Sequence, residues 1–385
     1  MEMWANIPSD ILLSIVKRLI LANDLVAAAA VCKSWRSTVH LFRNVKTSPD
    51  IPLLMLAERS KFGLYSNKGN NKRGFFSLLD RKTYYMNLPQ TNRQRCHGVG
   101  FGWILTLGLD LQIKLINPFS KRLVNLPPET AFVEPMYPYH CKPKKIRRIA
   151  IHKAVVSSNP WNSEAQHYNP NCVVMMIYGE YGFLTFTRSG HEAWIDVVMP
   201  SYVRRCPFSD IIYCRNRFYA VNAHYDVIAC SIDDRDVSIV THVAYIPSYL
   251  DMLSTKYLVE LSGELLMICR SYSYDRTIHP ETMTRSFEVL KLIKDEETGY
   301  EFVKIESLDD HALFVGQSAS FSLSASNMNG CEGNCIYFTD DYSLNYTEKR
   351  GSGSDMGVYN FEDKKIEPFY SGQSLSYFSS PIWYI

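Results

Sequence analysis

The N-terminal 43 residues show the clearest helical periodicity in the chain. Apolar side chains recur there on one helical face, at Ile7, Ile11, Leu12, Ile15, Val16 and Leu19. Pro8 suits the first turn of a helix, where its missing N–H leaves no hydrogen bond unmade. Asn23 and Asp24 can cap a second helix, and a third follows around Trp35. Three such helices in about 40 residues are too few to fold alone as a rule. The module therefore needs a partner or a neighbouring domain to cover its apolar surface.

After a connector at residues 44–52, short β-type runs alternate with polar turns, and one unit recurs. It consists of an apolar strand, a polar turn, a second strand and usually an apolar residue followed by Pro. Six copies begin at Phe75, Ile113, Leu184, Val227, Phe287 and Gly357. Because each copy joins two strands through a turn, each predicts a β-hairpin.

A second kind of hairpin lies between these copies. Clear examples begin at His97, Phe208 and Lys256, with turns at Gly102, Asn216 and Ser262–Gly263. Looser examples pair 146–156 with 172–179, and 318–326 with 335–341. Two hairpins per repeat make four antiparallel strands, which is the blade of a β-propeller.

The predicted fold is mainly β with a small all-α N-terminal module: three helices at 1–43, a linker at 44–52 and a six-bladed propeller at 53–385. A closed ring leaves no bare sheet edge. We therefore expect the apolar run at 53–56 to supply a strand that completes the last blade. Two packed β-sandwiches are the alternative, because blade boundaries drawn from one sequence are soft.

Composition narrows the classes of partner. Apolar residues make up 46% of the chain, enough for a sizeable core, and the formal net charge is +2. That balance gives no reason to expect nucleic acid or a membrane as a partner. No apolar run reaches membrane-spanning length, and no signal peptide is evident. The ten cysteines are scattered singly, as expected of reduced thiols in the cytoplasm or nucleus.

Candidate catalytic and metal-binding residues are few. The pairs Asp233–Asp234 and Asp340–Asp341 are expected in or beside hairpin turns, where Asp is favoured for its turn geometry. Cys331 and Cys335 have the spacing of half a metal site, but no second pair or His cluster accompanies them. The sequence also lacks a phosphate-binding loop, a nucleophile elbow and a dinucleotide fingerprint. We expect no catalytic residue, no metal and no cofactor.

The N-terminal residues resemble the F-box. The resemblance rests on Ile7-Pro8, on Asp24-Leu25 and above all on the run VCKSWR from Val31 to Arg36. It implies docking on a Skp-type adaptor of a cullin–RING ubiquitin ligase. The residues it assigns to that contact are Ile7, Pro8, Leu12, Leu13, Ile15, Leu19, Leu25, Val31, Cys32 and Trp35. Two departures are Ile-Pro in place of the usual Leu-Pro and a slightly long link from Leu19 to Val31. The alternative is a helical hairpin packed on its own protein.

The remainder resembles the KIB-type β-propeller of a group of plant F-box proteins. The segments INPFSKRLVNLPP and SGELLMICR carry this second resemblance, while the Gly-Gly and Trp-Asp pairs of other propeller repeats are missing. It implies a plant source and the propeller fold, and it names no substrate.

The function expected is that of the substrate-recognition subunit of an SCF-type (Skp–cullin–F-box) E3 ubiquitin ligase. The alternative is an F-box protein that sequesters or regulates a partner without ubiquitin transfer. A third reading, a propeller enzyme acting on glycans or phosphates, would need acidic or basic residues converging on the central channel.

Two long loops are candidates for target binding, because aromatic and basic side chains on loops anchor protein partners. The insertion from Pro128 to Asn171 carries Tyr137, Tyr139, His140, Trp161 and Tyr168. A second loop, at 271–279, carries Tyr272, Tyr274 and Arg276. The basic run at 142–148 is either a nuclear import signal or a solvated loop that enters a strand.

Overall fold

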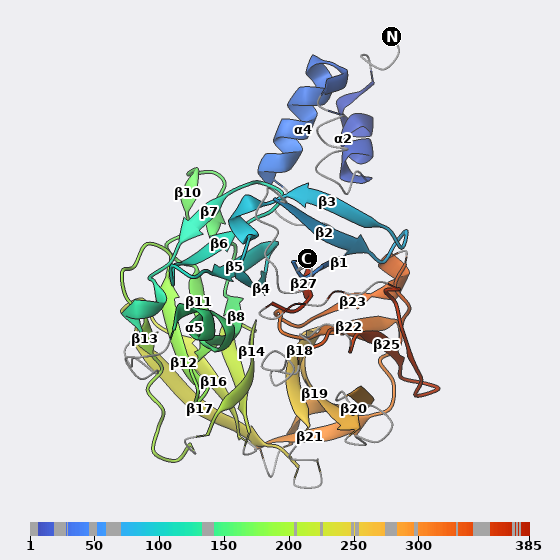
Figure 1. The fold of residues 1–385 in the computed structure, drawn as a ribbon. Coiled ribbons are helices and arrows are strands. Elements are labelled where there is room, and N and C mark those ends of the chain that lie inside the picture. The colour runs from blue at the N-terminus through green and yellow to red at the C-terminus, as the bar shows by residue number, and fades with distance from the viewer. Residues whose placement is uncertain are drawn as a thin grey trace.

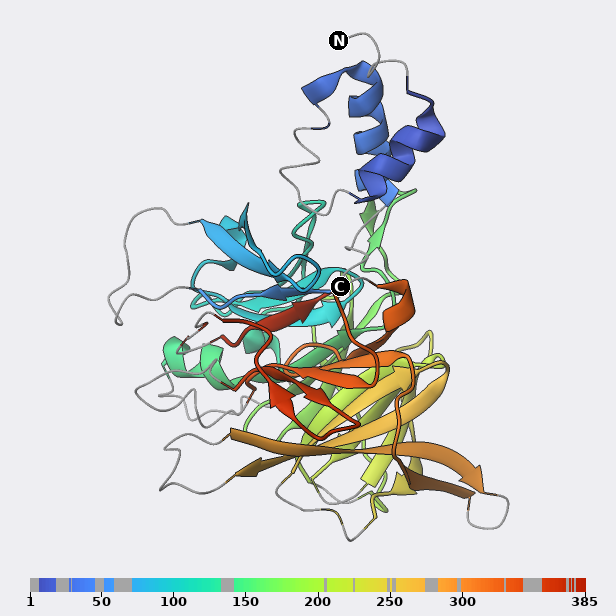
Figure 2. The same cartoon turned by 90° about the vertical axis from the view of Figure 1, so that its right-hand side faces the viewer.

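The computed structural model describes residues 7–18, 28, 30–45, 52–58, 71–132, 142–203, 206–223, 226–247, 250, 254–273, 283–295, 299–328, 330–341, 355–371, 374, 376 and 379–385. In the described part of the chain, a helical module stands at the rim of a ring of sheets (Figure 1, Figure 2).

The module contains helices α2 (Ser9–Arg18) and α4 (Lys33–Val45). Helix α2 begins after Pro8, whose carbonyl accepts the first helical hydrogen bond from the Leu12 N–H at 2.9 Å. Of the second predicted helix, Ala28 and Ala30 are helical, and residues 19–27 lie outside the described residues. Helix α4 continues past residue 43, the predicted end of the module.

Six sheets of the described residues surround a central axis (Figure 1). In chain order they hold β1 (Leu53–Met55), β2 (Lys72–Ser77) and β3 (Thr83–Asn87); then β4 (Arg95–Gly100), β5 (Trp103–Leu107), β6 (Ile113–Ile116) and β7 (Leu123–Asn125). Blade 3 has β8 (Ile151–Val156), β11 (Val173–Tyr178), β12 (Phe183–Arg188) and β13 (Ile195–Asp196), and blade 4 has β14 (Phe208–Cys214), β15 (Arg217–Asn222), β16 (Asp226–Ile232) and β17 (Ser238–Tyr245). Blade 5 has β18 (Thr255–Leu261), β19 (Glu264–Ser273), β20 (Met283–Asp295) and β21 (Gly299–Ile305). Blade 6 has β22 (His311–Val315), β23 (Phe321–Ser324), β24 (Cys335–Phe338), β25 (Gly357–Asn360) and β26 (Ile366–Glu367), and β27 (Ile382–Tyr384) returns to blade 1.

The recurring hairpin is present in all six blades, and the looser pair of 146–156 with 172–179 forms β8–β11, but the predicted pairing of 318–326 with 335–341 is wrong because β22 lies between β23 and β24. The six recurring units form the pairs β2–β3, β6–β7, β12–β13, β16–β17, β20–β21 and β25–β26. The three clear inner hairpins form β4–β5, β14–β15 and β18–β19. The prediction of a six-bladed propeller is therefore confirmed, and the alternative of two β-sandwiches is wrong.

The core is divided among the interfaces between neighbouring blades, with a hydrophobic cluster at each. In β8, for example, Val155 packs towards blade 4 while Val156 packs towards blade 2. Successive side chains of a strand point to opposite faces, and here both faces are buried. This explains why inner strands such as β11 read as continuous apolar runs rather than alternating ones.

Blade 6 departs from the predicted four antiparallel strands. It holds five strands in the order β23-β22-β24-β25-β26, and β22 pairs with β24 in parallel. The innermost position is taken by β23, which contacts β18 of the preceding blade. Because β23 occupies that place, β22 is the second strand of the blade, and β24 lies beside it in the same direction.

The ring closes through the two ends of the propeller. Strand β1 pairs with β27 antiparallel, Leu54 lying opposite Trp383. The two segments expected to meet therefore do so, but their roles are exchanged. The C-terminal strand β27 forms the innermost strand of the first blade, whereas the prediction had the N-terminal strand completing the last blade.

The basic run at 142–148 is part of a helix and not a solvated loop. Helix α5 (Pro143–Ile149) begins with Pro at its first position, where no N–H is needed. On this helix the side chains of Ile146 and Arg147 are buried, and those of Lys144 and Lys145 are exposed. The propeller was predicted without helices because a seven-residue helix spans too few turns to give a clear period.

Candidate protein-docking surfaces

The helical module has its own small core. Leu12 and Val16 on α2 pack with Ala28 and with Trp35 and Val39 on α4. Residues four apart share one helical face, so each helix contributes one adjacent pair to this core. Two of the predicted adaptor contacts, Leu12 and Trp35, are thus buried inside the module at 0% and 8% exposure.

The outer surface of the module carries apolar side chains. Ile11 is 51% exposed and Val31 is 52% exposed, and Pro8 at the start of α2 is also exposed. The predicted contacts that are partly buried beside the core are Ile7, Leu13, Ile15 and Cys32. Leu19 and Leu25 lie outside the described residues. Ile11 belongs to the apolar periodicity of α2 but was missing from the predicted contacts. Periodicity alone does not show which apolar side chains of a helix are buried in the core and which stay exposed.

Of the predicted target-binding loops, Tyr137, Tyr139, His140, Tyr274 and Arg276 lie outside the described residues. A hairpin of β9 (Trp161–Asn162) and β10 (His167–Tyr168) projects from blade 3 (Figure 1). In it Tyr168 is 45% exposed, and the Trp161 ring is half-buried with the Arg122 guanidinium 5.0 Å from its centroid.

The prediction for Tyr272 is wrong. This residue belongs to β19, is 5% exposed, and its hydroxyl lies 2.8 Å from the Thr255 hydroxyl. A side chain held in this way has no surface left for a partner. The sequence suggested a loop because Ser and Tyr alternate there, but the strand continues to Ser273.

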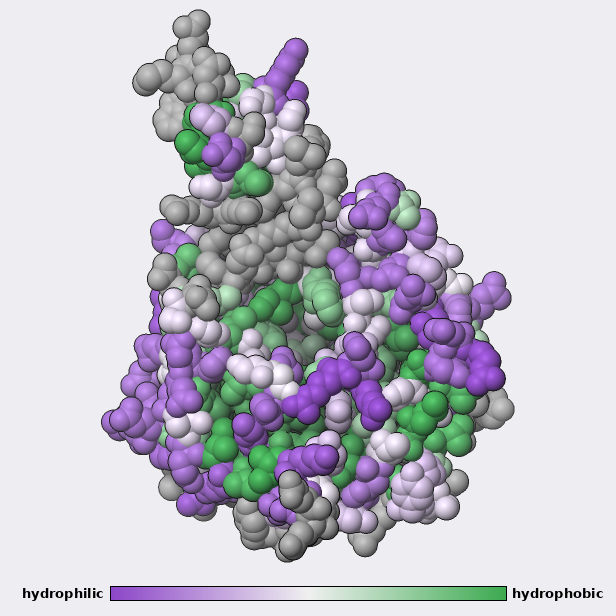
Figure 3. Space-filling model, turned by 180° about the vertical axis from the view of Figure 1, so that it is seen from behind, coloured by the Kyte–Doolittle hydropathy of each residue, from purple (hydrophilic) through white to green (hydrophobic). Residues whose placement is uncertain are grey.

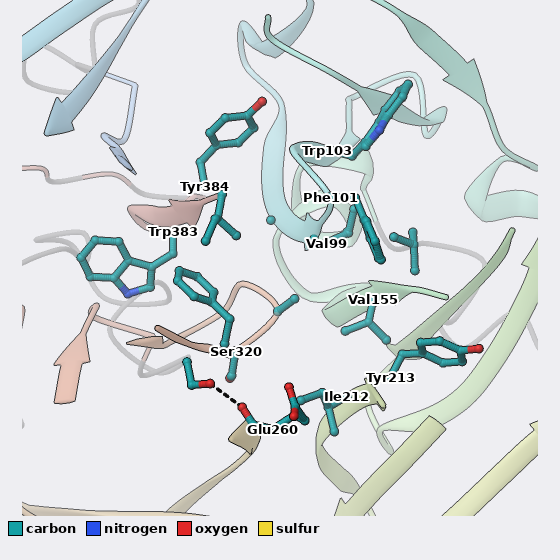
Figure 4. Close-up of a pocket in the computed structure, with 17 residues that line it drawn as sticks. Val99, Phe101, Trp103, Val155, Ile212, Tyr213, Glu260, Ser320, Trp383 and Tyr384 are labelled. Atoms are coloured by element: carbon teal, nitrogen blue, oxygen red, sulfur yellow. Dashed lines mark hydrogen bonds between the residues drawn. The ribbon is translucent and has the colours of Figure 1, made fainter. Parts of the chain in front are cut away.

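The inner strands enclose a channel, and one of its mouths is hollow. Strands β27, β4, β8, β14, β18 and β23 form the inner ring, each contacting the next. At the ends of these strands a cavity of about 250 Å³ is lined by residues from every blade. Figure 3 shows the hollow at the centre of this face, with the helical module rising above the rim. Figure 4 shows lining residues from different blades around the cavity, among them Val99, Val155 and Ile212, with the Trp383 ring directed away from its centre.

Inside the propeller, charged side chains are paired. The Arg270 guanidinium is 0% exposed and contacts the carboxylates of Asp341 at 3.0 Å and Asp355 at 2.9 Å. Burial raises the pKa of Asp341, and Arg270 opposes that shift. Asp340 and Asp341 follow β24 in its connection to β25, beside a hairpin as predicted, but they are not solvated: Asp340 is fully buried, and Asp341 also accepts a hydrogen bond from the Tyr257 hydroxyl. Asp233–Asp234 do lie at the turn between β16 and β17.

A second buried pair joins blades 3 and 4. Lys153 on β8 forms an ion pair with Asp210 on β14, and its ammonium donates to the Ser320 hydroxyl at 3.0 Å. Asp210 also accepts a hydrogen bond from the Leu258 N–H at 2.6 Å. Burial raises the pKa of Asp210 to about 6, although Lys153 acts in the opposite direction. Such pairs fix the register between blades, since a buried charge without its partner is strongly unfavourable.

His97, on β4, is fully buried, and its Nε2 accepts a hydrogen bond from the Arg95 guanidinium at 3.2 Å. Burial and the neighbouring Arg95 hold the pKa of His97 well below its usual value. The ring is therefore neutral and serves as an acceptor for the buried guanidinium.

Among the described residues, no group of three His, Cys, Asp or Glu side chains is arranged to hold a metal ion. Cys331 and Cys335 lie in and after the loop that leads into β24, and burial raises the pKa of each thiol to about 11. In the described part of the chain, no helix is both long and apolar enough to cross a membrane.

The described chain combines a small helical module with a closed propeller, and comparison with known proteins identifies both parts. The F-box-like family model matches residues 4–47, and the model of the KIB1-4 beta-propeller matches residues 75–360. The chain therefore belongs to the KIB1-4 beta-propeller family and begins with an F-box, so both predicted resemblances are confirmed.

Two curated relatives named as F-box proteins align with this chain over most of their length. F-box protein SKIP23 of Arabidopsis thaliana is 24% identical, over 94% of this chain and 90% of that protein. F-box protein At2g17036 of the same plant is 23% identical, over 94% of this chain and 90% of its own length.

Proposed function

We propose that this chain is the substrate-recognition subunit of an SCF-type E3 ubiquitin ligase. The F-box docks on a Skp-type adaptor, and the propeller holds a target protein for ubiquitination and degradation. Such a subunit acts in the cytoplasm or nucleus, where thiols remain reduced; the buried Cys96, Cys172, Cys214, Cys230, Cys269 and Cys335 are free thiols.

The observation that supports adaptor docking most directly is that the module buries some of its apolar side chains and leaves others exposed. Leu12 and Trp35 are buried in the core of the module, whereas Ile11 and Val31 are about half exposed. Large aliphatic side chains that are exposed on a small module are suited to burial against another chain. The adaptor contact is therefore expected on Pro8, Ile11 and Val31, with the core residues acting indirectly.

This function needs no catalytic residue on the chain. Tethering a target beside the ubiquitin-charged enzyme raises the local concentration of its lysines to the millimolar range, on the order of that for short flexible linkers. Ordered proximity alone then accelerates the transfer.

The test is a double variant, Ile11→Asp with Val31→Asp, in the full-length chain. Each carboxylate would have to be buried against the adaptor, so we expect adaptor affinity to fall by at least about a hundredfold. Ser37→Asp is the matched control, because Ser37 is exposed on the side of α4 away from the buried Trp35 and Val39. Unchanged binding by the double variant, measured by calorimetry with a purified Skp-type adaptor, would disprove the docking assignment.

The alternative, sequestration without ubiquitin transfer, makes a different prediction. A ligase subunit shortens the half-life of its target, and proteasome inhibition restores it. A sequestering protein leaves that half-life unchanged by the inhibitor.

A further inference from the structure

Three inner hairpins end at the hollow mouth in the same two-residue turn. The turns are Phe101–Gly102, Arg215–Asn216 and Ser262–Gly263, each closed by a flanking strand pair. Both residues of each turn have positive φ, with 53°, 50° and 50° at the first position of the three turns. This is the backbone of a two-residue hairpin of type I′.

Phe101 is an unfavourable residue for its position. In the left-handed region the β-carbon crowds the following carbonyl oxygen, so Gly, Asn and Asp are favoured and a bulky aromatic is disfavoured. The Phe101 side chain is also 48% exposed. The equivalent turns carry the polar residues Arg215 and Ser262. Neither folding nor solubility therefore calls for an aromatic side chain here, and aromatic residues are enriched at protein interfaces.

The cavity beside Phe101 is shaped for one side chain. Its lining includes Val155, Ile212 and Phe321, and the nearly fully buried Trp103 and Trp383 also border it. Its volume of about 250 Å³ is below the range of about 300–1,000 Å³ typical of small-molecule sites. The apolar lining fits an aliphatic or aromatic side chain presented by an extended chain segment.

Charged side chains at this mouth come from two neighbouring turns: the Arg215 guanidinium donates to the Gly263 carbonyl and lies 3.6 Å from the Glu264 carboxylate. Of the side chains that line the cavity, Glu260 is the charged one. Figure 4 shows Glu260 at the edge of the cavity, where its backbone carbonyl accepts a hydrogen bond from the Ser322 hydroxyl. One oxygen of its carboxylate accepts the Gly263 N–H of its own turn. A half-buried carboxylate beside an apolar cavity complements a cation on the incoming segment.

We propose that this mouth binds an extended segment of the target protein in which an apolar side chain enters the cavity beside Phe101 and a neighbouring Lys or Arg meets Glu260. This inference rests on the proposed function, because it names the site and chemistry by which the propeller recognises its target.

The test uses a random peptide library displayed on phage and selected on the full-length chain. We expect enrichment of an apolar residue next to Lys or Arg. Synthetic copies of the enriched peptides are then measured by fluorescence anisotropy on two variants. Phe101→Asn should weaken binding by about tenfold or more, with thermal unfolding unchanged or shifted upward because Asn suits the left-handed backbone. Glu260→Gln keeps an acceptor for Gly263 and removes the charge. It should weaken binding by about tenfold, and the difference should shrink at high salt.

Tyr181→Ser is the matched control, because Tyr181 is 62% exposed on blade 3 and does not line this cavity. The inference is overturned if no peptide is enriched, if the enriched peptides lack a basic residue, or if they bind Phe101→Asn and Glu260→Gln as well as the parent. Adaptor binding is measured on the same samples. If the parent chain binds the enriched peptides but no Skp-type adaptor, the proposed ligase function alone is overturned. If the parent chain binds the adaptor but no peptide, this inference alone is overturned.

Discussion

Closure of the ring depends on Trp383, and replacing it gives a strong test of the fold. Its indole is 2% exposed between blades 6 and 1. The ring lies 5.0 Å from Phe314, nearly perpendicular to it, and 5.4 Å from Phe369. The indole N–H donates to the Val315 carbonyl at 3.2 Å. One side chain therefore joins the last strand of the chain to the preceding blade through both packing and a hydrogen bond.

Trp383→Ala removes both contributions. Truncating a buried aromatic side chain costs about 3–5 kcal/mol, and a buried carbonyl that loses its donor costs about 1–3 kcal/mol more. The sum of about 4–8 kcal/mol is comparable with the whole free energy of unfolding of an ordinary domain, about 5–15 kcal/mol. Trp383→Phe keeps most of the packing and loses the hydrogen bond, so it should cost about 1–3 kcal/mol.

The measurement is equilibrium unfolding in urea, followed by far-ultraviolet circular dichroism. We expect the midpoint of unfolding to lie at a clearly lower urea concentration for the alanine variant than for the phenylalanine variant. Equal losses from both variants would show that the hydrogen bond and not the packing dominates. A loss below about 1 kcal/mol for Trp383→Ala would refute the reasoning that this side chain holds the ring closed.

Two further predictions concern the closure and the buried ion pair. A β-carbon at Gly98 would collide with the Trp383 carbonyl oxygen, whereas one at Gly100 meets nothing within 4 Å. Gly98→Ala should therefore cost about 1–3 kcal/mol in the same unfolding experiment and Gly100→Ala about 1 kcal/mol from its positive φ alone; a reversed order would contradict the geometry. Asp210 has a pKa of about 6 in the folded chain against about 3.9 when unfolded. The folded state therefore binds this proton more tightly, and the contribution of Asp210 to stability rises by about 2 kcal/mol as the pH falls from about 6 to 4, with no change above that range. The double variant Lys153→Met with Asp210→Asn should lack this rise, and an identical pH profile in both proteins would rule out Asp210 as its source.

Much of the fold could be predicted because its signals are local. Each hairpin carries its own turn, such as Gly102 after β4 or Asn216 after β14, and its own pair of apolar runs. The F-box was likewise readable from one short segment around Trp35. These features depend on residues close in sequence, so one chain is sufficient to find them.

The predictions that failed depend on contacts between distant residues. The position of Asp341 beside a hairpin was predicted, but its ion pair with Arg270, 71 positions away, was not. The place of β22 as the second strand of its blade follows from β23 taking the inner ring beside β18, which no local pattern records. The mouth of the channel shows the same limit. Phe101 marks only a turn in the sequence, and its relation to Glu260 arises when six blades meet at one axis.

The sequence by itself determined the helical docking module, the repeated hairpins and their number, because periodicity and turn chemistry act over a few residues. The tertiary structure alone decided which apolar side chains are core and which are open, as with Leu12 and Ile11 one position apart on α2. It also decided how the ring closes and where its cavity lies. These properties depend on which surfaces become buried against one another, and burial is a property of the folded chain.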